Sequence, residues 1–158
     1  MRHSLFLITT LLAAFLGWND VAAQSYETEC ISHEQDGSQT LRVWGKGRNR
    51  SDAVEQAKKD AVYEILFKGV RKGNSGYNLR PIVTEVNARE RYREYFDIFF
   101  MDGGEYLKYI SMADRKIGSS RKEKGDVQVR YCITVRVLVP ELRERMISDG
   151  ILQREERP

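Results

Sequence analysis

The residue types that most often carry catalysis or bind metals are sparse in this sequence. It contains two histidines, His3 and His33, among 158 residues. Beyond the amino-terminal 23 residues, any histidine-dependent triad or multi-histidine metal site would have to include His33. This histidine opens the polar run HEQDGS, which is typical of a surface turn. We therefore predict a protein that is not an enzyme and that has no catalytic residue, no metal site and no cofactor.

The two cysteines, Cys30 and Cys132, form an even pair. Such a pair is ordinarily bonded in an oxidising compartment. A bond would close a loop of about 100 residues and, by chain entropy, stabilise the fold by about 4 kcal/mol. We predict a Cys30–Cys132 disulfide on the more open face of a sheet, with the two Cα atoms within about 7 Å. Two free thiols are the alternative, and a thiol count separates the two cases.

Gly45 and Gly47 stand one residue apart, just ahead of a predicted helix. The spacing resembles a phosphate-binding turn, but the third glycine of the dinucleotide motif is absent. The Gly-Lys-Ser/Thr sequence of a P-loop is also absent. We interpret the glycines as a tight strand-to-helix turn. Anion binding at the start of the helix is the alternative.

Alternation along two predicted strands gives a candidate binding surface. Arg42, Trp44 and Lys46 share one parity of the first, and Arg130 and Arg136 share the polar parity of the second. If both sets point away from the helices, they form a basic face with one aromatic residue at its centre. Tryptophan and arginine are favoured at protein interfaces. We predict that this face binds a partner. A solvated face, with Trp44 covered by aliphatic stems, is the alternative.

A second basic surface comes from the predicted hairpin at 115–124, which has five basic residues and one acidic residue. It offers a place for peripheral contact with an anionic envelope membrane. The chain as a whole is nearly balanced, with 26 Lys and Arg against 23 Asp and Glu. Such a balance does not favour nucleic acid as a partner.

The amino terminus predicts export. Arg2 and His3 precede an uncharged apolar run at 5–16, and small residues follow at 21–23. The run is far shorter than the roughly 20 residues that a membrane span needs. We therefore predict a signal peptide, 1–23, cleaved after Ala23, and a periplasmic or secreted protein. Gln24 rather than cysteine follows the cut, so we expect no lipid anchor. An uncleaved membrane anchor or a buried helix is the alternative.

The rest of the chain is long enough for one domain, 24–152, followed by a disordered tail, 153–158. Apolar periodicity predicts the order strand, strand, helix, helix, strand, strand, helix. The first helix carries alanines four residues apart, and Ser51 is its expected cap. The predicted class is α+β, an antiparallel sheet of about four strands with helices packed on one face. The expected elements are strands at 26–32, 39–46, 105–116 and 126–139, and helices at 52–68, 83–99 and 141–148.

The segment 43–70 resembles a known envelope family. A strand ends in Gly-x-Gly, a helix follows with alanines four apart, and the segment closes on A-V-x-x-x-L-x-x-G. It is similar to the amino-terminal domain of the flagellar assembly protein FlgT and to the related twenty-kilodalton outer-membrane lipoproteins. The resemblance implies an envelope protein that assembles with other proteins and has no catalytic centre. The matching residues are Gly45, Gly47, Ala53, Ala57, Ala61, Val62 and Gly69.

These observations favour an exported interaction or assembly module of the cell envelope. Its partner would be another envelope protein or a second copy of the chain, bound through the open sheet face or the basic hairpin. The alternative is a secreted ligand-binding or inhibitor-type domain. Its pocket would lie under segment 72–104, lined by Tyr92, Tyr95 and Phe96. A secreted enzyme is the third hypothesis.

Overall fold

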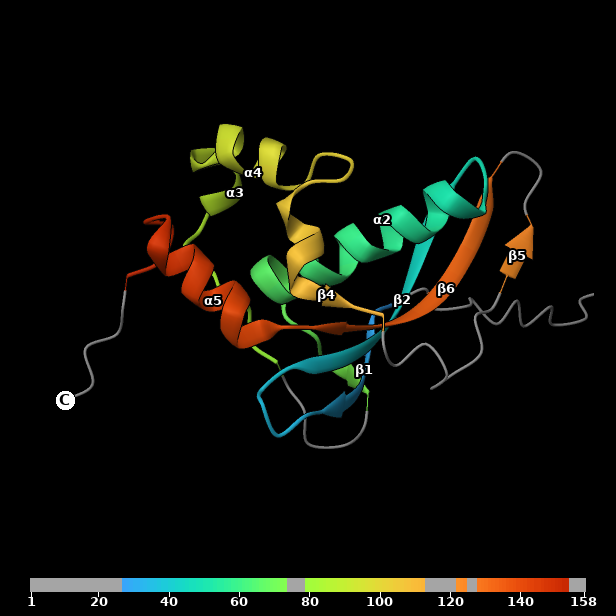
Figure 1. The fold of residues 1–158 in the computed structure, drawn as a ribbon, viewed down its shortest axis with the longest axis horizontal. Helices are drawn as coiled ribbons and strands as arrows, with labels where there is room; N and C mark the ends of the chain where they lie inside the picture. Colours follow the sequence, from blue (N-terminus) through green and yellow to red (C-terminus); the bar gives the residue numbers. More distant parts are fainter. Residues whose placement is uncertain (1–26, 74–78, 113–121, 125–127, 154–158) are drawn as a thin grey trace, which may run out of the picture.

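The computed structural model describes residues 27–73, 79–112, 122–124 and 128–153. The predicted signal peptide and positions 154–158 of the predicted tail lie outside the described residues. A sheet forms the centre of the fold, in the order β3-β1-β2-β6-β4, with β5 also paired to β6 (Figure 1). Its strands are β1 (Glu29–His33), β2 (Gln39–Gly47), β3 (Lys72–Gly73), β4 (Ile110–Ser111), β5 (Lys122–Lys124) and β6 (Val129–Val137).

The α+β class is confirmed, but the sheet is not purely antiparallel. The β1–β2, β2–β6, β4–β6 and β5–β6 pairs are antiparallel, whereas β1 and β3 run parallel. β4 and β5 pair with different parts of β6. The predicted four-stranded antiparallel sheet is therefore replaced by a mixed sheet in which two long strands, β2 and β6, form the central ladder.

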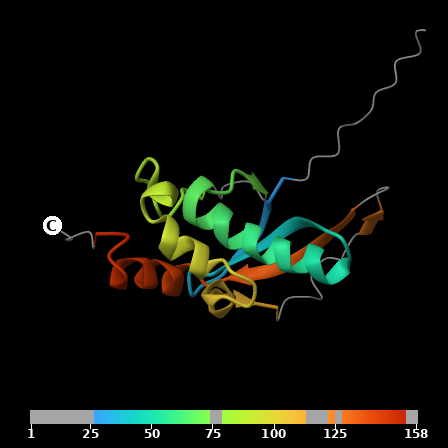
Figure 2. The ribbon, with the colours of Figure 1, turned by 90° about the horizontal axis from the view of Figure 1, so that it is seen from above.

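The longest helix, α2 (Arg50–Tyr63), lies across this ladder and continues into a π-helical turn, η1 (Glu64–Lys68) (Figures 1 and 2). None of the described helices is both long and apolar enough to cross a membrane. The remaining helical elements are α3 (Ala88–Arg91), α4 (Arg93–Phe99), the 3-10 helix η2 (Glu105–Tyr109) and α5 (Val139–Ser148).

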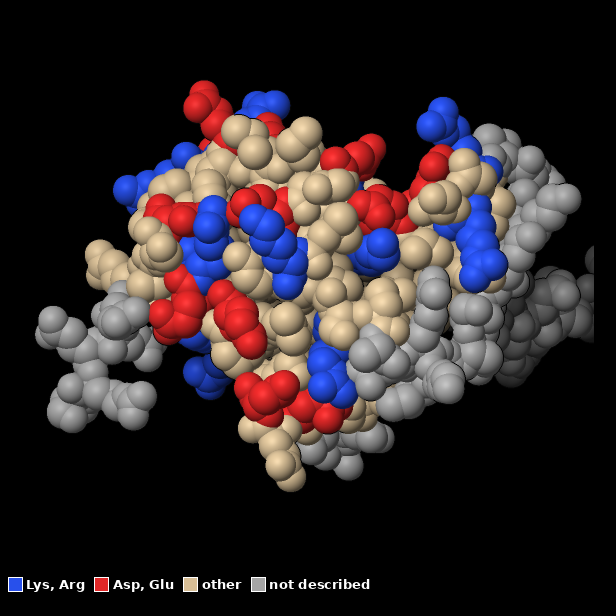
Figure 3. Space-filling model, in the orientation of Figure 1, with Lys and Arg blue, Asp and Glu red and all other residues tan. Residues whose placement is uncertain are grey.

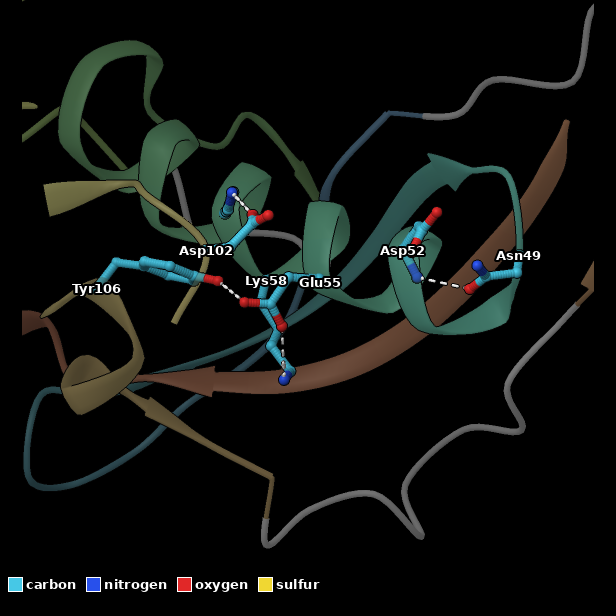
Figure 4. Close-up of polar contacts among 7 residues, drawn as sticks. Asn49, Asp52, Glu55, Lys58, Asp102 and Tyr106 are labelled. Atoms are coloured by element: carbon cyan, nitrogen blue, oxygen red, sulfur yellow. Dashed lines mark hydrogen bonds and ion pairs between the residues drawn. The ribbon is translucent and has the colours of Figure 1, made fainter. Parts of the chain in front are cut away.

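α2 begins two residues earlier than predicted. The Asn49 side chain accepts a hydrogen bond from the backbone N–H of Asp52, at 3.0 Å, and so satisfies one of the free donors of the first turn (Figure 4). Asp52 also pairs with Arg48, at 3.2 Å. Asn49 is therefore the cap, and the prediction that Ser51 caps the helix is wrong.

The alanine stripe allows α2 to pack very close to the sheet. Ala53, Ala57 and Ala61 are fully buried, and Gly45 of β2 lies directly beneath the first two. A Cβ atom on Gly45 would lie 2.0 Å from the carbonyl oxygen of Ala53 and 2.5 Å from the backbone nitrogen of Ala57. Gly45 and Gly47 do not have positive φ. The two glycines therefore serve close packing rather than an unusual turn conformation.

The predicted helix at 83–99 is split into two short helices, and residues 83–87 are not helical. The backbone N–H groups of Ile82 and Val83 donate to the carbonyls of Ile65 and Leu66, at 3.0 and 2.8 Å. These carbonyls lie in the η1 turn, so the chain at 82–83 completes hydrogen bonds that the end of the helix leaves open. Asn87, with φ of 62°, then starts the short helix α3. Local periodicity at 83–99 was outweighed by this tertiary pairing.

The predicted strand at 105–116 is mostly helical where the structure describes it. Residues 105–109 form η2, and only Ile110 and Ser111 join the sheet. Tyr106 and Tyr109 are both buried. A spacing of three places both rings on one side of a 3-10 helix, whereas a strand would place them on opposite sides.

Two polar bridges fix α2 to the chain that precedes and forms η2. Lys59 pairs with Asp102, at 2.5 Å, and the hydroxyl of Tyr106 donates to the carboxylate of Glu55 (Figure 4). Glu55 also pairs with Lys58, at 3.2 Å. Burial by itself raises the pKa of Glu55, but the hydrogen bonds from Tyr106 and Lys58 outweigh it and lower that pKa.

We expect Gly45→Ala to destabilise the fold by about 3 kcal/mol, because its methyl group would overlap the backbone of α2. Gly150→Ala is the matched control. Gly150 has φ of 72°, and a methyl group there would meet no other atom within 4 Å, so the control should lose only about 1 kcal/mol through left-handed strain. Urea unfolding of both variants measures the difference. Equal losses would contradict the close packing.

We expect Tyr106→Phe to cost about 2 kcal/mol at neutral pH, since it removes a hydrogen bond to an ionised carboxylate. The pKa of Glu55 is depressed in the fold, so the stability that it contributes is present above its unfolded pKa and is lost as the pH falls through its folded pKa. The difference between variant and wild type should shrink in acid. Urea unfolding at pH 7 and pH 3 tests this, and a difference independent of pH would argue against the Glu55 contact.

Candidate partner-binding face

The register between β2 and β6 brings the predicted binding residues onto one face of the sheet. Directly opposed pairs in this ladder include Trp44 with Cys132 and Lys46 with Arg130. Paired residues project to the same side, and so do residues two apart on one strand. Leu41, on the other parity, is in the core that α2 covers. The residues on the face opposite α2 are Thr40, Arg42, Trp44, Lys46, Arg130, Cys132, Thr134 and Arg136.

Three of the four cross-strand pairs on this face join a long side chain to a small one, namely Arg136 with Thr40, Arg42 with Thr134 and Trp44 with Cys132. Lys46 is exposed, and Arg42, Trp44, Arg130 and Arg136 are half-buried. The small residues among them, Thr40, Cys132 and Thr134, are buried. The predicted residues therefore do lie together, and the accessible part of the face consists of one tryptophan and several basic side chains.

The face is mixed in charge rather than purely basic. Glu29 of β1 pairs with Arg42 at 3.1 Å and with Lys72 at 3.3 Å, and Glu34 lies 3.8 Å from Arg136. Hydrogen bonds from Ser32 and Thr40, reinforced by the Arg136 charge, lower the pKa of Glu34. Counting parity along β2 and β6 could not identify either glutamate, because Glu29 belongs to β1 and Glu34 to the segment that follows β1. On the side of the molecule that Figure 3 shows, which is the side seen in Figure 1, acidic and basic side chains are also interspersed.

The predicted disulfide is absent: Cys30 and Cys132 are both buried, and they are not bonded to each other. Cys30 is paired with Leu41 on the side covered by α2, whereas Cys132 is paired with Trp44 on the opposite side. The strand β2 also runs between them, and two strand spacings amount to roughly 9.5 Å. This exceeds the Cα separation of about 7 Å that a disulfide spans. The pairing prediction is therefore wrong.

A β-bulge in β1 explains the error. The register with β2 shifts between Cys30 and Ser32, so these residues lie on opposite faces although they are two apart. Ser32 bonds Glu34 on the open side, at 2.7 Å. The Cys30 thiol instead contacts the side-chain oxygen of Gln39, at 3.7 Å, in the core. Burial raises the pKa of the Cys30 thiol.

Two other features considered in the sequence analysis, His33 and the basic hairpin, do not belong to β2 or β6. His33 ends β1, and its Nδ1 lies 3.1 Å from the Gln39 side-chain nitrogen. Within the described ranges, no group of three or more His, Cys, Asp or Glu side chains could hold a metal ion. The basic hairpin at 115–124 lies outside the described residues except for the strand β5.

The aromatic residues of segment 72–104 pack on one another. Phe96 is fully buried and contacts Tyr95, with ring centroids 5.1 Å apart, while Tyr95 also stacks on Phe99. The Tyr95 hydroxyl donates to Asp149 of the α5 end, at 2.5 Å. Burial and this bond raise the pKa of Tyr95. The cavity that lies along residues 83–90 is lined by Tyr63 and Phe67 rather than by Tyr92, Tyr95 or Phe96.

A larger hollow was not anticipated from the sequence. A groove of about 670 Å³ lies beside β2, between residues 27–28, the later turns of α2, the η1 turn and residues 69–71. Gln56, Asp60 and Glu64 line it at intervals of four residues along the helical path. This polar stripe is visible in the sequence, but such stripes ordinarily face open solvent. The stripe lines a groove because residues 69–71, which follow the η1 turn, form the opposite wall.

We found no match to this chain among protein-family models, curated proteins or solved structures. The resemblance of segment 43–70 to the FlgT and lipoprotein families therefore stays a prediction.

The arrangement of the cysteines predicts two thiols that are not joined in a disulfide. Denatured without reductant, the protein should take up two alkyl groups, and the native protein should react much more slowly because both thiols are buried. Intact-mass measurement gives the count and also reports where the mature chain begins. Alkylation that requires prior reduction would show a disulfide and would overturn the β1–β2–β6 register.

Proposed function

We propose that this protein is an exported, non-enzymatic interaction module of the cell envelope, which binds a protein partner through the β2–β6 face. The observation that carries the proposal is the gathering of Arg42, Trp44, Lys46, Arg130 and Arg136 on the side of the ladder away from α2. Because both strands are long and regular, these side chains are held on a rigid platform. Rigid presentation lowers the entropy lost on binding.

The side chains on this face are suited to recognising a polar protein surface. Tryptophan and arginine provide large contact areas and are over-represented among residues that dominate binding energy. The pair between Arg42 and Glu29 orients the guanidinium before a partner arrives. The mixed charge favours a partner that carries both signs, rather than a uniformly acidic polymer such as nucleic acid. A second copy of the chain is one such partner.

The signal-peptide prediction supports the envelope setting, and the segment 43–70 resemblance supports an assembly role. The ligand-binding alternative gains one specific observation, because the groove beside β2 has the volume of a small-molecule site. That groove is separate from the aromatic residues from which the alternative was first inferred.

The proposal is tested by photo-crosslinking the partner from a residue on the β2–β6 face. A photo-crosslinking amino acid, p-benzoylphenylalanine, is placed at exposed Lys46 and, as a control, at exposed Glu141 of α5. After irradiation of cells that export the protein, mass spectrometry identifies a species cross-linked from position 46 and absent from position 141. Equal cross-linking from both positions would argue against the face.

We expect the triple variant Arg42→Ala, Trp44→Ala, Arg136→Ala to weaken binding of that partner by more than about 30-fold, the effect of losing one dominant interface residue. The double variant Arg80→Ala, Arg143→Ala is the control, because both side chains are exposed and neither residue belongs to β2 or β6. Titration calorimetry with the purified partner measures affinity, and circular dichroism confirms that each variant is folded. Wild-type affinity in a folded triple variant would exclude this face.

A further inference from the structure

The groove beside β2 contains a carboxylate whose charge is poorly compensated. Asp60 lines the groove and is about half-buried, and it accepts a hydrogen bond from the Gln56 side chain, at 2.8 Å. Among the ion pairs of the described residues, none includes Asp60. Its one identified polar side-chain contact is thus with a neutral amide, which supplies a hydrogen bond but no positive charge.

The nearest lysines are engaged with other acids. Lys68 pairs with Glu64, at 2.8 Å, and Lys59 pairs with Asp102, at 2.5 Å. Lys68 also lies 5.4 Å from the centre of the Tyr63 ring. The wall of the groove therefore already holds one ammonium group between a carboxylate and an aromatic ring, which is a favourable environment for such a group.

The charges that face the groove favour a cation. Among the described residues that line it, the acids are Glu27, Asp60 and Glu64 and the bases are Lys68 and Arg71. Burial raises the pKa of Asp60, and the neighbouring Glu64 adds to this, while Lys68 and Lys59 oppose it. The ionised form of Asp60 is thus disfavoured in the protein alone, and an incoming positive charge would relieve that cost.

We propose that this groove binds an alkylammonium or guanidinium group, with Asp60 as its counter-ion, and that the group belongs to a lysine or arginine side chain of a partner protein. The volume of about 670 Å³ holds such a side chain together with adjoining backbone. The Tyr63 ring can pack on the long aliphatic part of such a side chain, while the polar wall beside it contacts the charged end. The choice of a protein side chain rests on the proposed function, whereas the cation chemistry of the groove does not.

The probes are Nα-acetyl-lysine methylamide and Nα-acetyl-arginine methylamide, with Nα-acetyl-norleucine methylamide as the uncharged control. Backbone amide NMR of the full chain follows each titration. We expect saturable shifts at residues 60–64 and 69–71 with the charged probes and no saturable shifts with norleucine. Absence of a saturable response to both charged probes, or an equal response to norleucine, overturns the proposal.

Asp60→Asn is the decisive variant. It keeps the shape and removes the charge, so we expect it to weaken binding of the lysine probe by about tenfold or more. Glu94→Gln, at an exposed acid of α4, is the matched control and should bind as the wild type does. Unchanged binding by Asp60→Asn overturns the role of Asp60.

The stability of Asp60→Asn separates a binding role from a structural one. A carboxyl whose folded pKa is raised opposes folding once the pH is above that pKa. Asp60→Asn should therefore be as stable as the wild type at pH 7 or more stable, as measured by urea unfolding. A large loss of stability would show that Asp60 supports the fold instead. Probe affinity should also fall as acid protonates Asp60.

Butylammonium tests the source of the cation. If the groove binds a protein side chain, the lysine probe should bind more tightly than butylammonium, because the amide groups of the probe also contact the groove. Equal or tighter binding of butylammonium overturns the assignment to a partner side chain and indicates a free amine. These titrations need no partner protein. Their outcome is therefore independent of the cross-linking from the sheet face, and either experiment can succeed when the other fails.

Discussion

The close approach of α2 to the β2–β6 ladder is the constraint on which the rest of the structure depends. A helix can lie this near a sheet only where neither surface carries bulk, and here Gly45 faces Ala53 and Ala57. With the helix this close, the remaining space between helix and sheet is filled by the branched side chains on the buried side of β6, such as Val135 and Val137. The alternate residues of both strands therefore point to the opposite face of the sheet, away from α2.

The same packing determines where the groove lies. The β1–β2 register ends at the pair Glu29 and Arg42, so β1 does not pair with Val43 and Trp44, the β2 residues that line the groove. The chain returns alongside through Gly69 and Val70, which is bridged to Leu79. Val43 and Trp44 of β2 therefore contribute to the groove, and Trp44 also belongs to the sheet face. Both proposed surfaces adjoin the same strand.

The sequence predicted the elements whose patterns are long and internally consistent. Seven apolar residues on one parity identified β6, and alanines four apart identified α2 and its buried side. Two of the failures arose from pairing between segments, which a pattern counted along one segment does not record. The pairing of residues 82–83 with η1 overrode the helical periodicity that follows Pro81. The bulge at Ile31 reversed the side on which Cys30 lies, and a bulge leaves no mark in a parity count.

The candidate site was predicted unevenly for the same reason. Residues along two paired strands could be assigned to one face by counting, so Arg42, Trp44, Lys46, Arg130 and Arg136 were found together. Glu29 was missed because the register of β1 was unknown, and Glu34 because it lies in the segment after β1. The groove was missed because its second wall comes from residues 69–71.

The central ladder also has a consequence for the order of folding. β2 lies near the start of the domain and β6 near its end, about 90 residues apart, and loop closure over such a distance is entropically costly and slow. α2 has no complete sheet to pack against until β6 is available. A nascent chain therefore cannot complete the central ladder until β6, the last of the described strands, has been synthesised.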